Sequence, residues 1–222
     1  MKHSSRIALL LAAVLLLSLS ACNAKPKPQP YEAPVRAFEA LLNNSEAAWP
    51  DAVEAAVGEF CSEELTSLAK LMIQTGDTTD ETMTEQLLGE YREVYGSDCT
   101  WTFVIEKAEP MDEATLKHYR DQLRSDSEFF DENLQELLRD GAVDWESGQP
   151  LEETAEMEEL CTTLRDRFAD AEISEGYVLK LIVTVSGGDL KGSEQGEDTM
   201  NILCIDGVWV IGDVFDNTYT QH

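Results

Sequence analysis

The spacing of apolar positions changes several times along the chain, and each change marks an expected element. After an apolar run at the N-terminus, the first half places apolar side chains three or four positions apart, which is typical of amphipathic helices. Residues 99–105 then alternate apolar and polar side chains, and this period of two predicts a strand with one buried face. The helices expected before this strand cover residues 34–42, 50–60, 63–75 and 79–95.

Helical spacing returns after the first strand. Residues 112–139 are expected to form helix with a break near Ser125-Asp126-Ser127, and residues 151–169 form another helix. Alternation resumes in the C-terminal part, where the polar segment 187–196 is interpreted as a loop between two strands. The strands expected there cover residues 177–185, 199–205 and 208–214.

A short turn signal fixes the end of this sheet. Asp206-Gly207 separates the last two strands by two residues, which favours a type I′ hairpin. The whole pattern predicts one α+β domain over residues 34–222, with N-terminal helices packed on a curved antiparallel sheet. An extra helical insertion follows the first strand.

The first 21 residues have the pattern of a secretory signal peptide. Lys2 and Arg6 precede an apolar run, Ile7–Leu19, that is shorter than the roughly 20 residues needed to span a membrane. Leu19-Ser20-Ala21-Cys22 follows and resembles the lipobox of bacterial prolipoproteins. This resemblance implies cleavage between Ala21 and Cys22, and a diacylglyceryl group with palmitate-type chains on the Cys22 sulfur.

Such an anchor would hold the domain at a membrane surface. One acyl chain gives only marginal binding, about 10⁴ M⁻¹, so two chains on one residue make a durable attachment. In the linker, residues 22–33, prolines alternate with polar residues, and Pro-rich chains favour an extended, semi-rigid conformation. We therefore expect a lipid-anchored protein on the extracytoplasmic face of the cell membrane.

Charge narrows the classes of partner. Without residues 1–21 the chain has 14 basic and 44 acidic side chains, a net charge of −30. Nucleic-acid binding requires basic patches, so this class is excluded, and neutral or cationic partners are favoured. The acids are spread along the chain instead of being gathered at ligand spacing, so we expect a solubilising surface, no metal site and no cofactor.

Four cysteines remain after Cys22. Outside the cytoplasm they permit disulfides in three connectivities. Each one stands where a small hydrophobic residue would fit, so buried free thiols are favoured over bridges without excluding them. These cysteines are Cys61, Cys99, Cys161 and Cys204.

Motifs for catalysis are scarce. The sequence has no GxSxG, P-loop, HExxH or zinc-type cluster. His118 is expected on a polar helix surface in contact with solvent. Trp101, Tyr177 and Trp209 lie on expected strands and are interpreted as core or pocket-wall aromatics, with core preferred.

The order of elements resembles a known superfamily. Helices come first, and a twisted antiparallel sheet ends in the segment Ile205-Asp-Gly-Val-Trp-Val-Ile211. This arrangement resembles the nuclear transport factor 2-like, or cystatin-like, α+β roll over residues 34–215, above all in small lipoproteins of Gram-positive bacteria. Val208 stands where those lipoproteins carry lysine, and the helical segment 112–169 is longer than the roll requires.

The resemblance implies a sheet curled around a cone-shaped pocket. A non-enzymatic module that binds an envelope protein or a small neutral or cationic ligand is the preferred function. A structural envelope lipoprotein without a small ligand is the alternative. A ketosteroid-isomerase-like enzyme is the third possibility and would need an Asp or Tyr of raised pKa inside the cone. Tyr91, Tyr119 and Tyr177 are the candidates for that role.

Overall fold

The computed structural model is an α+β fold. It describes residues 29–44, 47–74, 96, 98–140, 154–188, 190 and 192–215. These residues contain five α-helices, two short 3₁₀ turns and an open four-stranded antiparallel sheet. In chain order the elements are α2 (Glu32–Leu42), α3 (Trp49–Val57), η1 (Gly58–Phe60), α4 (Ser62–Gln74), β1 (Cys99–Pro110), α6 (Glu113–Asp140), α7 (Thr154–Asp170), β2 (Ile173–Gly187), β3 (Ser193–Ile205), β4 (Val208–Ile211) and η2 (Gly212–Phe215).

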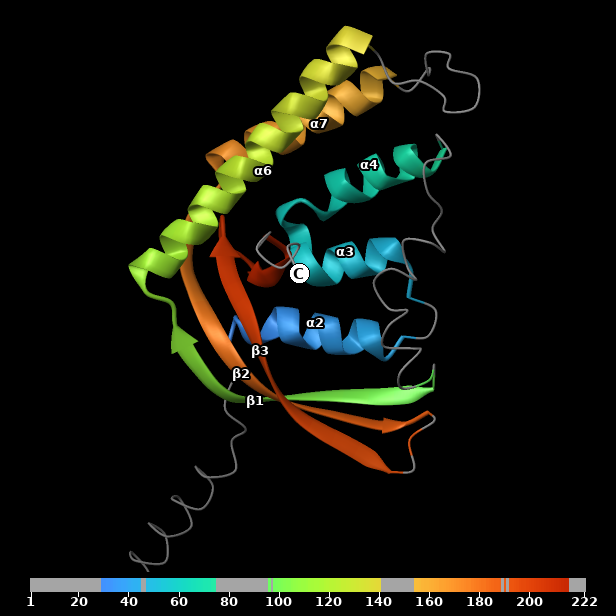
Figure 1. Cartoon of the computed structure of the whole chain (residues 1–222), viewed down its shortest axis with the longest axis vertical. Coiled ribbons are helices and arrows are strands. Elements are labelled where there is room, and N and C mark those ends of the chain that lie inside the picture. The colour runs from blue at the N-terminus through green and yellow to red at the C-terminus, as the bar shows by residue number, and fades with distance from the viewer. Residues whose placement is uncertain are drawn as a thin grey trace, which may run out of the picture.

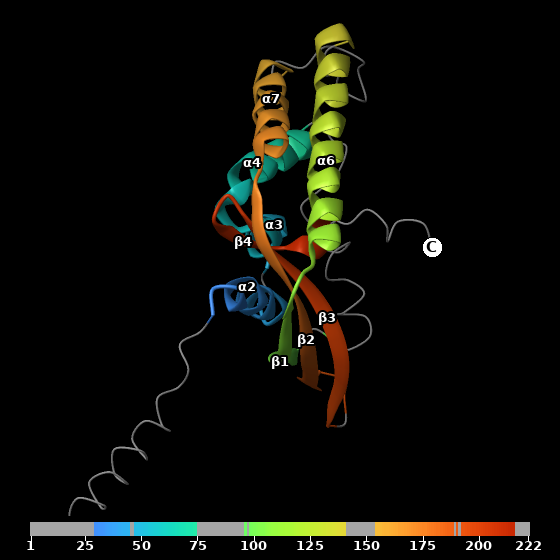
Figure 2. The same cartoon turned by 90° about the vertical axis from the view of Figure 1, so that its left-hand side faces the viewer.

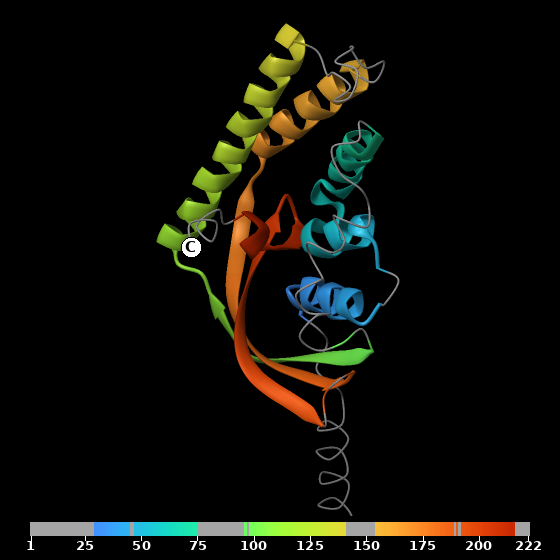
Figure 3. The same ribbon diagram turned by 45° about the vertical axis from the view of Figure 1, so that its right-hand side comes forward.

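The sheet has the order β1-β2-β3-β4 with every neighbouring pair antiparallel. Its long strands bend strongly along their length (Figures 1 and 3). The last turn is the expected hairpin, because Asp206 and Gly207 have φ of 51° and 82° and join the paired residues Ile205 and Val208. Both positive φ values are those of a type I′ turn, so this prediction is confirmed.

Helix α2 fills the inside of this bend. Figure 1 shows α2, α3 and α4 one above the other on the concave side of the sheet. Val35 of α2 is fully buried, and it belongs to the same core cluster as Leu179, Leu181 and Ile202 of the sheet. Since these strand residues are also 0–1% exposed, the apolar positions at i and i+2 form one continuous face under the helix.

A second core lies at the other end of the sheet. Helices α6 and α7 run side by side and project away from the strands (Figures 1 and 2). Where they meet the sheet, Leu164 and Phe168 of α7 pack with Phe60 and with Leu203 and Val210 of the last hairpin. The hairpin is therefore buried on both faces, one toward α2 and one toward α6 and α7.

Three side chains of α2 cover the outer edge of β1. Asn43 accepts from the Trp101 N–H at 2.8 Å and donates to the Trp101 carbonyl at 2.9 Å. Glu39 accepts from the Phe103 N–H at 3.1 Å, and Arg36 donates to the Phe103 carbonyl at 2.7 Å. The helix thus supplies the hydrogen bonds that a further strand would make, which protects this edge from pairing with another chain.

Three sequence predictions are wrong in detail. Helix α6 continues through Ser127, because the Ser127 hydroxyl donates to the Arg165 carbonyl of α7 at 3.0 Å and is buried. Strand β3 begins at Ser193, so most of the expected loop 187–196 is strand. The final strand ends at Ile211, where η2 begins. The helix expected over residues 79–95 lies outside the described residues.

Candidate functional site

The aromatic residues selected from the sequence fall into two groups. Tyr177 and Trp209 lie 5.9 Å apart between ring centroids, and Tyr31 joins them at 4.7 Å and 6.2 Å. Trp101 is buried elsewhere, with its ring stacked on Phe103 at 6.5 Å, so it is a core residue as preferred. Tyr31 was missed from the sequence, although it directly follows Pro30, the last of the alternating prolines.

Tyr177 meets only part of what the enzyme hypothesis requires, because its pKa is raised but its surroundings are polar and partly exposed. Its ring is half-buried, and its hydroxyl donates to the Glu175 carboxylate at 3.4 Å. Burial, followed by the neighbouring Glu175 charge, raises the pKa of Tyr177 above its ordinary value. The hydroxyl therefore keeps its proton at neutral pH. Tyr119 of α6 is buried in the core that α6 forms with α7, and Tyr91 lies outside the described residues.

The concave side of the sheet offers no wide cone within the described part of the chain. Val35 occupies the centre, and Phe38 meets Phe103 edge-on with ring centroids 6.0 Å apart. The space in which a guest would sit on a curled sheet is thus filled by α2. The hollows that remain lie on the surface.

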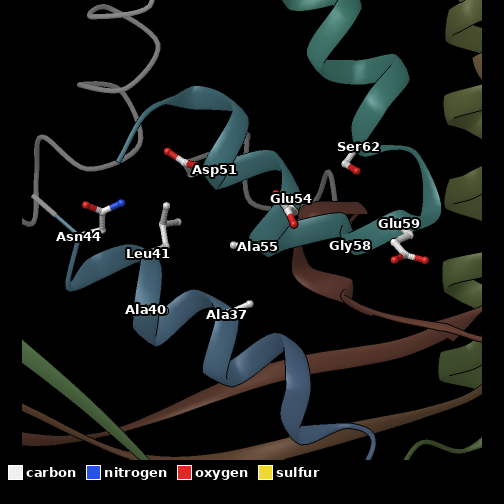
Figure 4. A pocket seen from close by; sticks show the side chains of 10 residues that line it. All are labelled: Ala37, Ala40, Leu41, Asn44, Asp51, Glu54, Ala55, Gly58, Glu59 and Ser62. Atoms are coloured by element: carbon white, nitrogen blue, oxygen red, sulfur yellow. The ribbon is translucent and has the colours of Figure 1, made fainter. Parts of the chain in front are cut away.

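The first hollow is a cleft of about 360 Å³ between α2 and α3. Figure 4 shows Ala37 and Leu41 of α2 pointing toward α3, with Ala55 on the facing helix. Carboxylates form the rim at Asp51, Glu54 and Glu59. The remaining lining residues are Ala40, Asn44, Gly58 and Ser62.

The rim carboxylates have different roles. Asp51 accepts from the Ala48 N–H at 2.8 Å and so caps the start of α3. Glu54 and Glu59 are exposed. A cleft with a small apolar floor and a carboxylate rim suits an aliphatic stem that carries a positive charge.

The second hollow, of about 280 Å³, lies at the outer end of the sheet. Trp101, Val183 and Val185 line it from β1 and β2. Strand β3 contributes residues 194–198, in which Glu194, Glu197 and Asp198 are acidic. Both hollows therefore combine apolar surface with carboxylates.

Other chemistry is sparse in the described residues. They contain no group of three or more His, Cys, Asp or Glu side chains placed to hold a metal ion. No helix among them is long and apolar enough to cross a bilayer. His118 is half-buried on α6, where it is partly in contact with solvent, and its ring lies 5.6 Å from that of Tyr119.

The four described cysteines are free thiols, as preferred from the sequence. Cys61, Cys161 and Cys204 are buried, and Cys99 is half-buried with its sulfur 3.1 Å from the Trp101 indole nitrogen. Burial, and then the Glu64 charge, raises the pKa of Cys61 to about 12, and burial raises the pKa of Cys161. Thiols that hold their protons so strongly are poor nucleophiles.

Comparison with protein-family models, with curated proteins and with solved structures finds no match for this chain. The class of the fold, an α+β domain with helices on an open antiparallel sheet, therefore rests on the geometry alone. The function must likewise be argued from the two acid-rimmed hollows and the filled interior.

Proposed function

We propose that this protein is a lipid-anchored interaction module on the extracytoplasmic face of the cell membrane, and that it binds a neutral or cationic partner protein. The observation that carries the proposal is the packing of α2 against the concave face of the sheet. Because Val35 and its neighbours fill that face, binding falls to surface hollows rimmed with carboxylates.

The anchor is proposed at Cys22 after cleavage behind Ala21, both outside the described residues. Helix α2 begins at Glu32, so about ten residues separate the lipid from the domain. An extended Pro-rich chain of that length reaches on the order of 30 Å. Tyr31 packs on Tyr177 and Trp209, and this contact fixes where the linker meets the domain.

We further propose that the fold is a cystatin-like roll in which α6 and α7 form an added helical hairpin. The support is the order of the elements and the strong bend of the antiparallel sheet around α2 (Figure 1). Helices α6 and α7 project away from the outer ends of β2 and β3 (Figure 3), and none of their residues lines either hollow.

The partner's charge follows from the rims of the hollows. A net charge of −30 disfavours anionic partners, and opposite charges at a rim speed association more than they add affinity. Binding should therefore weaken as salt is raised.

The test is cross-linked capture from native envelope extracts at low and high ionic strength. Glu54→Gln/Glu59→Gln should lose captured protein, whereas Glu128→Gln/Glu132→Gln on α6 removes the same charge away from both hollows and should retain it. Equal capture by all three proteins would contradict the role of the cleft. The filled interior also supports a purely structural envelope lipoprotein, and absence of any salt-sensitive capture would favour that alternative.

A second test addresses the anchor. Cys22→Ala should release the protein from the membrane fraction or leave it uncut, and mass spectrometry of the mature chain should show acyl mass on Cys22. A mature N-terminus at another residue without lipid would refute the anchor and leave the binding proposal standing.

A further inference from the structure

The far edge of β3 is covered along only part of its length. Strand β4 pairs with Ile202–Ile205, and its last pair joins Ile202 to Ile211. Beyond it, Asp213 of η2 accepts from the Asn201 N–H at 3.1 Å. From Ser193 to Met200 the sheet has no further strand among the described residues.

The direction of the backbone groups along this segment follows from the Asn201 contact. In an antiparallel sheet, alternate residues direct their N–H and C=O groups to opposite neighbours. Since the Asn201 N–H points to the far edge, those of Thr199, Glu197 and Gln195 do so as well. The Thr199 N–H meets the Asp198 carboxylate at 2.7 Å. The backbone N–H and C=O groups of Gln195 and Glu197 face the edge of β3 that no described strand covers.

A slot for a side chain lies beside these groups. Gly196 pairs with Val183, and a Cβ built on Gly196 would meet nothing within 4 Å. Glu194 and Asp198 share the face of Gly196, because side chains two residues apart point to the same side of a strand. The missing side chain thus opens a gap between two carboxylates.

The floor of this slot is apolar. Val183, Val185 and Trp101 line the same hollow, and Trp101 and Val185 are at most 5% exposed. A lysine or arginine side chain would lay its aliphatic stem on the valines and place its charge between Glu194 and Asp198. Figure 3 shows the outer ends of β2 and β3 projecting beyond the helices, so a partner can approach them.

We propose that residues Ser193–Thr199 of β3 accept an extended cationic segment of a partner protein as an added strand, with a lysine or arginine side chain in the slot over Gly196. The new strand would bond to the Gln195 and Glu197 backbone groups, and the slot would fix its register. The inference rests on the proposed function and assigns a partner chemistry to the second hollow, as a binding site separate from the α2–α3 cleft.

The acidic side chains along Ser193–Thr199 favour a cationic partner over a second copy of this chain. Glu194, Glu197 and Asp198 line the segment. A third hollow of about 280 Å³ adjoins it across β1, β2 and β3, and Lys180 is the one basic residue in its lining. A second copy of the chain paired at this edge would bring the two acidic sets together, and like charges oppose such pairing. A cationic partner gains from the same charges.

The probe is a short peptide of alternating lysine and valine, titrated into the full lipidated chain in neutral detergent by fluorescence anisotropy. A peptide of equal charge with prolines in place of the valines cannot add as a strand. The alternating peptide should bind at least about tenfold more tightly than the proline peptide, since several backbone hydrogen bonds are at stake. Equal binding by the two peptides would overturn the inference.

Three variants locate the site. Gly196→Leu fills the slot without meeting other atoms at its Cβ, Gln195→Pro removes an outward donor, and Glu194→Gln/Asp198→Asn neutralises the slot. Each should weaken binding by about tenfold, the scale of a charge-assisted contact, while the far-UV spectrum stays unchanged. Unchanged affinity in Glu194→Gln/Asp198→Asn and in a folded Gly196→Leu would refute the site.

The cleft variant separates this inference from the proposed function. Glu54→Gln/Glu59→Gln should bind the alternating peptide normally. If it loses the peptide while the β3 variants keep it, the edge inference falls and the interaction module stands with the cleft as its site. If the peptide does not bind but salt-sensitive capture from extracts persists, the edge inference alone falls. If both fail, the proposed function falls with it.

Discussion

Both ends of β3 pair with β2, with one register shift at the inner end between Ile205 and Cys204, but the two ends differ completely in burial. Ile202, Leu203 and Ile205 at the inner end are 0% exposed, whereas every residue from Ser193 to Thr199 at the outer end is exposed. Backbone pairing holds both ends. The difference shows that side-chain burial, and not hydrogen bonding, divides this strand into a half that belongs to the core and a half whose side chains are exposed.

The two edges of the sheet show a similar contrast. The β1 edge is covered at Trp101 and Phe103 by three polar side chains of α2, which leaves little room for another strand. Among the described residues, the part of the β3 edge beyond β4 is protected by acidic side chains and by Asp213 at Asn201. Proteins use both devices to prevent edge pairing, but a charged edge still admits a partner of opposite charge.

The largest expected effect separates the two ends of β3. Leu203→Ala removes a fully buried side chain and should lower the free energy of unfolding by about 2–5 kcal/mol. Gln195→Ala at the exposed end should change it by less than about 0.5 kcal/mol. Denaturant unfolding measures both. Similar losses in the two variants would mean that the outer end is part of the core.

Two glycines of the sheet allow the same substitution to be compared at a buried position and at an exposed one. In Gly176→Ala the new Cβ would stand 2.7 Å from the Met111 sulfur and 3.0 Å from Leu203, so overpacking should cost roughly 1–3 kcal/mol. In Gly196→Ala it meets nothing within 4 Å, and stability should hold or rise slightly. Thermal melting compares them. A destabilised Gly196→Ala would show that the slot is already occupied.

The covered edge gives a smaller effect. Asn43→Ala removes both hydrogen bonds to Trp101 and should cost about 1 kcal/mol, because water can replace part of what is lost. The exposed β1 edge should also make the variant more prone to self-association. Unfolding and light scattering are the measurements. A variant as stable and as monomeric as the parent would argue that α2 does not protect this edge.

The rate of thiol labelling compares the outer and inner ends of the sheet without measuring stability. Cys99 at the outer end is half-buried, whereas Cys204, on the inner end of β3, is buried. Maleimide at neutral pH should therefore label Cys99 in the native protein and Cys204 only after denaturation, with or without reductant. Buried Cys61, whose pKa is raised to about 12, serves as an internal control that should also stay unlabelled. Thiols that appear only after reduction would show disulfides instead.

The sequence was informative wherever burial leaves a periodic pattern. Helix α2 and strand β1 each have one apolar face, and their existence followed from the spacing of residues such as Val35, Trp101 and Phe103. Asp206-Gly207 predicted the hairpin because positive φ at both positions restricts the residue types. Apolar spacing and turn residues are local features, so they can be interpreted without knowing which elements pack against them.

The features that sequence reasoning missed depend on contacts distant in the chain. The outer end of β3 is polar on both faces, so it carries no alternation and was interpreted as loop until its pairing with β2 was seen. Ser127 was interpreted as part of a helix break, because its hydrogen bond to the Arg165 carbonyl joins residues far apart in the chain and cannot be seen in the sequence. The open edge at Gln195 and Glu197 was beyond prediction, since it depends on where β4 ends.

Amide hydrogen exchange along β3 tests the central claim most directly. In the free protein the Leu203 and Ile205 amides, which face β4, should be strongly protected, and those of Gln195 and Glu197 should exchange rapidly at the open edge. Addition of the alternating lysine–valine peptide should slow exchange at Gln195 and Glu197 and leave Leu203 unchanged. Protection of Gln195 and Glu197 in the free protein, or no slowing with peptide, would contradict the division of β3 into a core half and a binding half.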